Sequence, residues 1–138
     1  MRSLVTMDML LVSLITLLAA VLVIWANLAM GRARHKYGVK PPAMTGHPAF
    51  ERASRAQANT LENVVPFLIG LWLCALLFSP FAAAILGFVW LVARVIFSVA
   101  YYNESSLRSP LFGVSILATF LLLIGGFIGV VQALLLVH

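Results

Sequence analysis

Residues 51–62 read Glu-Arg-Ala-Ser-Arg-Ala-Gln-Ala-Asn-Thr-Leu-Glu and continue, without a turn signal, into the apolar run of residues 63–78. On a helix, at about 100° per residue, five of the polar side chains fall on one stripe: Glu51, Arg52, Arg55, Asn59 and Glu62. Ionised groups at membrane depth cost several kcal/mol unless they are paired or hydrated. The stretch therefore predicts a membrane helix with a functional site along its polar stripe.

The composition of the chain excludes a soluble globular protein. Hydrophobic residues make up 63% of the 138 residues and charged residues only 9%, whereas a soluble domain carries about 25% charged residues. Nine Lys and Arg residues against four Asp and Glu give a net charge of +5. Because most of the basic residues lie beside hydrophobic segments, we attribute them to membrane topology and predict no nucleic-acid partner.

Four hydrophobic segments are each long enough to cross about 30 Å of hydrocarbon. They cover residues 9–30, 57–78, 81–101 and 111–137. The first segment could be a signal peptide, but its length favours an uncleaved span. The last carries Gly125 and Gly129 at a spacing that is typical of close helix contact. We predict a single all-α, integral membrane domain over residues 1–138, a four-transmembrane-helix up-down bundle.

The connections between the spans differ in kind. The first, residues 31–50, contains three prolines and is expected to be an irregular basic loop. Ser79-Pro80 predicts a tight turn between two helices. The third connection, residues 102–109, is a short polar loop, and Pro110 is expected to be the first residue of the last helix.

The distribution of cations predicts the orientation. Six of the nine cations precede the second span within the first connection and the polar stripe, and Arg108 lies in the third connection. The Ser79-Pro80 turn and the C-terminus carry no Lys or Arg. By the positive-inside rule, both basic loops are expected on the cytoplasmic side and both termini outside.

Arg94 interrupts an otherwise apolar third span. Antiparallel packing across the Ser79-Pro80 turn brings Glu62 and Arg94 to a similar depth, because each lies about sixteen residues from that turn. We predict a structural ion pair between Glu62 and Arg94 that fixes the register of the bundle.

Several polar residues are expected to cluster at one depth near the inner leaflet: Arg34, Arg55, Asn59, Tyr101 and Arg108. Taken singly, Tyr101 is typical of an interfacial belt, and Arg34 and Arg108 are typical of topology-setting charges. Together they would bind an anionic polar molecule, because Arg suits carboxylates and an amide suits peptide groups. No His, Cys and carboxylate set stands at metal-ligand spacing, so no metal site is predicted. Cys74, inside an apolar run, is expected to be a buried small residue and not a catalytic thiol.

Several motifs resemble the signature of the membrane-associated proteins in eicosanoid and glutathione metabolism. They are Phe50-Glu51-Arg52, Arg55-Ala56-Gln57-Ala58-Asn59, Glu62, Pro66-Phe67, Pro41-Pro42, Gly46, Arg94, Tyr101 and Leu107-Arg108. The four-span layout fits that family over the whole chain. The resemblance implies a homotrimer of four-helix subunits, with glutathione sites between neighbouring subunits near the cytosolic face.

The resemblance also implies roles for particular residues. The glutathione cradle would comprise Arg34, Arg55, Gln57, Asn59, Glu62 and Tyr101. Arg108 would be the catalytic residue, because a cation beside the glutathione thiol lowers its pKa and raises the thiolate population at neutral pH. The implied activity is that of a detoxifying membrane glutathione transferase, with glutathione as co-substrate, acting on lipophilic electrophiles and able to reduce lipid hydroperoxides. The alternative is a non-catalytic scaffold of the same family that binds or presents a lipid, and Arg108 is the feature that distinguishes the two.

Overall fold

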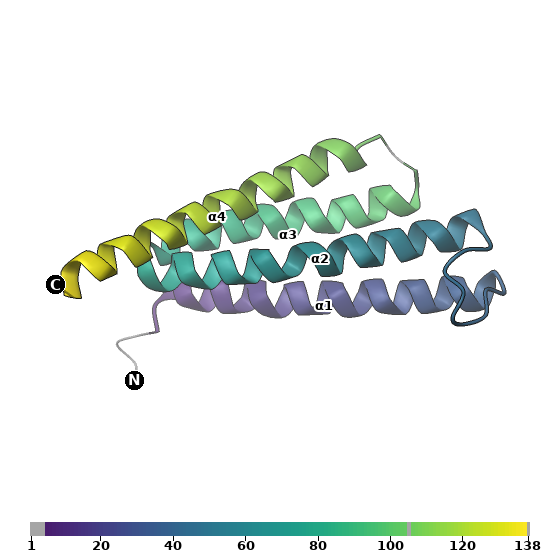
Figure 1. The fold of residues 1–138 in the computed structure, drawn as a ribbon, viewed down its shortest axis with the longest axis horizontal. Helices are drawn as coiled ribbons and strands as arrows, with labels where there is room; N and C mark the ends of the chain where they lie inside the picture. The colour runs from purple at the N-terminus through teal and green to yellow at the C-terminus, as the bar shows by residue number, and fades with distance from the viewer. Residues whose placement is uncertain (1–4, 105, 138) are drawn as a thin grey trace.

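The computed structural model describes residues 5–104 and 106–137, and the described chain is helical apart from its connections (Figure 1). The four helices, in chain order, are α1 (Met7–Lys36), α2 (Pro48–Leu77), α3 (Pro80–Tyr102) and α4 (Arg108–Val137). Successive helices run in opposite directions (Figure 1). Each is long and apolar enough to cross a membrane. The predicted all-α, four-helix integral membrane fold is confirmed.

The helices pack around α2 and α3, which contact each other and both remaining helices. α1 packs against α2 and α3 from one side, and α4 packs against them from the other. Within the described residues, α1 and α4 make no contact with one another. They therefore form opposite edges of the protomer, and α4 crosses the bundle at an angle to the other three helices (Figure 1).

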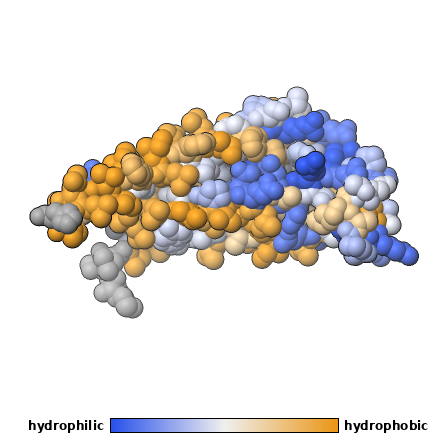
Figure 2. Space-filling model, in the orientation of Figure 1, coloured by the Kyte–Doolittle hydropathy of each residue, from blue (hydrophilic) through white to orange (hydrophobic). Residues whose placement is uncertain are grey.

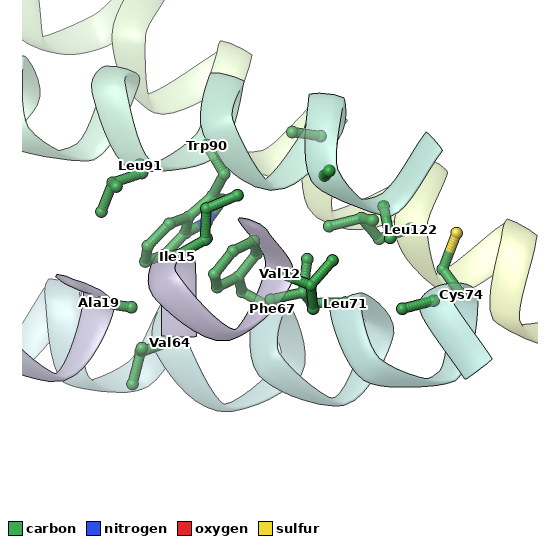
Figure 3. Close-up of a cluster of buried hydrophobic side chains, with 14 of the residues drawn as sticks. Val12, Ile15, Ala19, Val64, Phe67, Leu71, Cys74, Trp90, Leu91 and Leu122 are labelled. Carbon is green, nitrogen blue, oxygen red and sulfur yellow. The ribbon is translucent and has the colours of Figure 1, made fainter. Parts of the chain in front are cut away.

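The core lies between the four helices and draws most of its residues from α1, α2 and α3, with Leu122 contributed by α4 (Figure 3). Phe67 of α2 and Trp90 of α3 stack with their ring centroids 3.7 Å apart and their planes 3° from parallel. Ile15 of α1 and Leu71 of α2 pack in the same cluster. Cys74 is also buried there, as its apolar surroundings in the sequence predict.

The outer surface is apolar over most of its length. Large hydrophobic side chains are exposed on all four helices, an arrangement that suits lipid and not water. Hydrophilic residues gather at the end of the molecule that carries the α1–α2 and α3–α4 connections, and a hydrophilic band extends from that end toward the middle (Figure 2). We refer to this end as the polar end.

The first connection is shorter than expected, because both flanking helices continue beyond the hydrocarbon-length segments. α1 runs to Lys36, and its last turn is basic, which complements the partial negative charge of a helix C-terminus. α2 begins at Pro48, and the His47 side chain accepts a hydrogen bond from a backbone N–H of the first turn. The expectation of an irregular loop over residues 31–50 is therefore wrong at both ends, and only residues 37–47 are non-helical.

The other two connections differ in how well the sequence predicts them. Ser79-Pro80 forms the expected tight turn, and Ser79 Oγ accepts a hydrogen bond of 3.1 Å from the N–H of Ala82. The expectation that Pro110 opens the last helix is wrong, because α4 begins at Arg108. Pro110 still lies in the first turn, where a missing N–H removes no helical hydrogen bond. Arg108 is consequently held on a helix and not in a loop.

Glycines allow α4 to approach α2 closely, as the spacing of Gly125 and Gly129 predicts. A Cβ added at Gly129 would lie 2.6 Å from the backbone carbonyl of Leu77. One added at Gly126 would lie 2.8 Å from the Cβ of Leu73. Small residues at these positions bring the two backbones together in the half of the bundle opposite the polar end.

Candidate functional site

A pocket of about 380 Å³ opens at the polar end between α2, α3 and α4. Its lining residues are Asn59, Phe97, Tyr101, Arg108, Ser109 and Phe112. Asn59 comes from the polar stripe of α2, Tyr101 from the last turn of α3, and Arg108 from the first turn of α4. Three of the predicted site residues are thus brought together by three different helices. We call this the α2–α4 pocket.

The α2–α4 pocket favours an anion. The guanidinium carbon of Arg108 lies 5.5 Å from the centroid of the Tyr101 ring, in cation–π geometry. Arg108 also stands at the start of α4, where the helix contributes a partial positive charge. None of the described residues that line the pocket is acidic. A ligand with a carboxylate or thiolate would therefore meet two sources of positive potential and no opposing charge.

Arg94 holds the orientation of Asn59. Arg94 is fully buried, and its Nη2 donates hydrogen bonds to Asn59 Oδ1 at 2.7 Å and to Thr60 Oγ1 at 3.3 Å. Asn63 Nδ2 lies 3.3 Å from the same Asn59 oxygen. Because two donors hold Oδ1, the NH₂ group of Asn59 is the end of the amide that remains to donate to a ligand.

The predicted Glu62–Arg94 ion pair is wrong for the described protomer. The Arg94 guanidinium bonds to Asn59 and Thr60 instead, and the Glu62 side chain is exposed. The sequence placed both charges at a similar depth, but depth does not fix which side of α2 faces α3. Residues 59 and 62 point about 60° apart on a helix, and it is the side of Asn59 and Thr60 that faces Arg94.

A different ion pair forms at the polar end, between Arg52 of α2 and Glu104, which follows α3. The sequence does not predict this pair, because Glu104 lies in a connection whose path does not follow from helical spacing. Arg52 does not line the α2–α4 pocket; it lines a different pocket, between α1, α2 and α3.

Two further predicted site residues lie on the α1 side of the protomer. Gln57 Nε2 donates a 2.8 Å hydrogen bond to Asn27 Oδ1 of α1. Arg34 Nη1 donates a 2.7 Å hydrogen bond to the carbonyl of Ala43, and its guanidinium carbon lies 4.6 Å from the Phe50 ring centroid. Neither Gln57 nor Arg34 lines the α2–α4 pocket. Asn27 was not identified from the sequence, since a lone amide in a hydrophobic span carries little signal by itself.

Arg55 and Glu62 are exposed on α2, and no described residue forms an ion pair or side-chain hydrogen bond with either of them. Of the seven residues predicted to act on glutathione, the protomer gathers three in the α2–α4 pocket and leaves four outside it. Within the described chain, no cluster of three His, Cys, Asp or Glu side chains could hold a metal ion.

Comparison with known proteins assigns the family. The model of the MAPEG family matches residues 12–128. An uncharacterized protein of Synechocystis sp. is 43% identical over 122 residues, which cover 88% of this chain and 89% of the relative. Microsomal glutathione S-transferase 2 of Homo sapiens is 34% identical over 125 residues, covering 91% of this chain and 85% of the relative. Leukotriene C4 synthase of Cavia porcellus is 39% identical over 103 residues, covering 74% of this chain and 69% of the relative. The chain forms a four-helix integral membrane bundle and matches the family model over most of its length. It therefore belongs to the MAPEG family.

Proposed function

We propose that this protein is a membrane glutathione transferase that conjugates glutathione to lipophilic electrophiles and can also reduce lipid hydroperoxides. The observation that carries the proposal is the α2–α4 pocket, where Asn59, Tyr101 and Arg108 meet and no described lining residue is acidic. The names of two relatives, a microsomal glutathione S-transferase and a leukotriene C4 synthase, support the same chemistry.

The proposed chemistry follows from the charges in the pocket. Glutathione carries two carboxylates, two peptide groups and a thiol. The oriented NH₂ of Asn59 would donate to a peptide carbonyl, and the Arg108 guanidinium beside the sulfur would lower the pKa of the thiol. The thiol releases its proton to water, and the thiolate attacks the electrophilic carbon. With an aryl halide, a carbon–sulfur bond forms and halide leaves with the bonding electron pair.

A neighbouring subunit would complete the site. Arg34 and Gln57 lie on the α1 side of α2, whereas Asn59, Tyr101 and Arg108 lie on the side of α3 and α4. The two groups therefore lie on different sides of one protomer. We propose that a homotrimer joins the α1 edge of one copy to the α4 edge of the next, and that Arg55 and Glu62, exposed in the protomer, contact glutathione at this junction.

We propose that the glutathione site faces the cytoplasm, in the orientation that the positive-inside rule predicts. The polar end carries both basic connections, while the α2–α3 turn at the opposite end has no Lys or Arg. In this orientation the pocket meets the glutathione of the cytoplasm, and the electrophile arrives from the bilayer.

The Arg108→Ala variant tests the catalytic role. A nearby cation lowers a pKa by about one to three units, so we expect the thiolate population at neutral pH, and the rate of aryl-halide conjugation, to fall by about tenfold or more. Isothermal titration should still detect glutathione binding, because Arg108 is one of several contacts. Lys40→Ala, which removes an exposed cation from the same end but not from the pocket, should conjugate at the wild-type rate.

Two results would contradict the proposal. Unchanged conjugation in Arg108→Ala, with binding retained, would remove Arg108 from the mechanism. A wild-type protein that releases no heat with millimolar-range glutathione and gains no thiolate absorbance would exclude the transferase altogether. Binding without turnover would instead identify the non-catalytic scaffold.

A further inference from the structure

A long apolar groove runs along the outer surface of the protomer between α1 and α3. Its middle part is a hollow of about 450 Å³, with Leu18, Val21 and Trp25 on one side and Val95 and Val99 on the other. A second hollow of about 420 Å³ continues the groove toward the N-terminal end of α1, and the two share Leu18 and Leu91. We call this continuous surface the α1–α3 groove.

The α1–α3 groove ends in a cationic pocket at the polar end of the bundle. This pocket of about 500 Å³ shares Trp25 and Val99 with the groove, so the two are continuous. Arg32, Lys36 and Arg52 line it. Arg52 is already paired with Glu104, which leaves Arg32 and Lys36, one helical turn apart, as exposed cations without an acidic partner among the described residues.

Aromatic side chains mark the boundary between the cationic pocket and the apolar groove. Trp25 and Tyr102 meet edge to face, with ring centroids 5.5 Å apart. The Tyr102 hydroxyl is buried and has no hydrogen-bond partner among the described residues. Trp and Tyr prefer this depth, between lipid headgroups and acyl chains. The opposite end of the groove carries the acidic Asp8, so only one end attracts an anion.

We propose that the α1–α3 groove binds a membrane lipid with an anionic phosphate headgroup. The headgroup phosphate lies beside Arg32 and Lys36, and one acyl chain follows the groove past Trp25. From Trp25 to Leu11 the groove extends about 21 Å along α1 at 1.5 Å per residue. One leaflet of the hydrocarbon core is about 15 Å thick, so a single acyl chain fits within the apolar part.

Charge and depth together favour a lipid over other occupants. The cytoplasmic leaflet is rich in anionic lipids, and each Lys or Arg near its surface strengthens their binding by about fivefold. Arg32 and Lys36 lie next to the apolar α1–α3 groove. A free anion would leave that groove empty, whereas an acyl chain would fill it. This lipid site is separate from the α2–α4 pocket, and the two share no lining residue.

Quenching of Trp25 fluorescence by lipids with brominated acyl chains tests the proposal. The full-length protein is placed in phosphatidylcholine vesicles that contain a minor fraction of either brominated phosphatidylglycerol or brominated phosphatidylcholine. A Trp25→Phe variant isolates the signal of Trp25 from that of the other two tryptophans. We expect brominated phosphatidylglycerol to quench Trp25 at about fivefold or more lower mole fraction than brominated phosphatidylcholine.

Two lysines supply the matched comparison. Lys36→Ala should lose about fivefold of this preference, whereas Lys40→Ala should retain it, because Lys40 does not line the cationic pocket. Equal quenching by the two lipids in the wild-type protein would overturn the proposal, and so would an equal loss in both variants, which would mean general surface attraction. Displacement of the lipid by inorganic phosphate alone would also overturn the proposal. So would disulfide-linked dimers of Val95→Cys protomers in membranes, because a second copy would then cover the groove.

Discussion

At the scale of single residues, Arg94 is the most deeply buried charged side chain among the described residues. It is fully buried, yet its only hydrogen bonds go to the side chains of Asn59 and Thr60, and its Nε and Nη1 have no partner among the described residues. The guanidinium carbon lies 4.3 Å from the Phe97 ring centroid, which offsets part of the cost. A buried, unsatisfied donor costs about 1–3 kcal/mol. We attribute the presence of this buried cation to its hydrogen bond with Asn59, because that bond fixes the orientation of the Asn59 amide.

Arg94→Met therefore separates stability from binding. Methionine removes the cost of burying a guanidinium that has two unpartnered donor nitrogens, and this offsets the loss of the two hydrogen bonds from Nη2, so we expect the Tm in detergent to change little. Without Arg94, the amide of Asn59 is free to rotate, and glutathione affinity should fall by up to about tenfold, the value of one hydrogen bond. Thermal unfolding and isothermal titration measure the two effects. A strongly lowered Tm with unchanged affinity would show that Arg94 serves the fold alone.

At the scale of helices, the sequence predicts the features that depend on hydrophobicity. It does not predict the features that depend on how each helix is rotated about its axis. The four spans and the Ser79-Pro80 turn follow from apolar length and from the proline. The ends of α1 and α2 do not, because helical hydrogen bonding continues into water after the apolar residues stop. The pairing of Arg94 with Asn59, in place of Glu62, depends on how α2 is turned toward α3. Helical periodicity gives angles within one helix and not between two.

The contact between α2 and α4 gives a prediction at the same scale. In Gly129→Ala the new Cβ would lie 2.6 Å from the backbone of Leu77, so the helices must separate, and we expect a loss of about 1–3 kcal/mol of stability. Gly113→Ala is the matched control on the same helix. No described residue beyond the local helix backbone lies within 4 Å of its added Cβ, and alanine favours the helix by about 1 kcal/mol. Thermal unfolding in detergent should show a lowered Tm only for Gly129→Ala. Equal shifts in the two variants would mean that the close approach of α4 to α2 does not contribute to stability.

At the scale of the whole molecule, the sequence predicts a set of candidate site residues but not the side of the protomer on which each of them lies. Helical spacing places the polar residues of α2 near one another, yet Gln57 bonds to α1 while Asn59 bonds to α3. This division depends on the packing of three helices, which no single segment encodes. It also gives each protomer two unlike edges, and contacts between unlike edges form a closed ring when the rotation between copies allows it, as the proposed homotrimer requires.

Because α1 and α4 make no contact within the described chain, each copy in such a ring would serve two sites, one at each edge. Mixing wild-type subunits with Arg108→Ala subunits should lower conjugation in proportion to the wild-type fraction. Mixing them with a Gln57→Ala, Arg108→Ala double variant should lower it as the square of that fraction, as measured on co-expressed, purified protein of known composition. Identical curves would mean that each site lies within one chain. Because the two outer helices are separate, one doubly defective copy would silence the two sites that it shares with its neighbours and leave the third site of a trimer active.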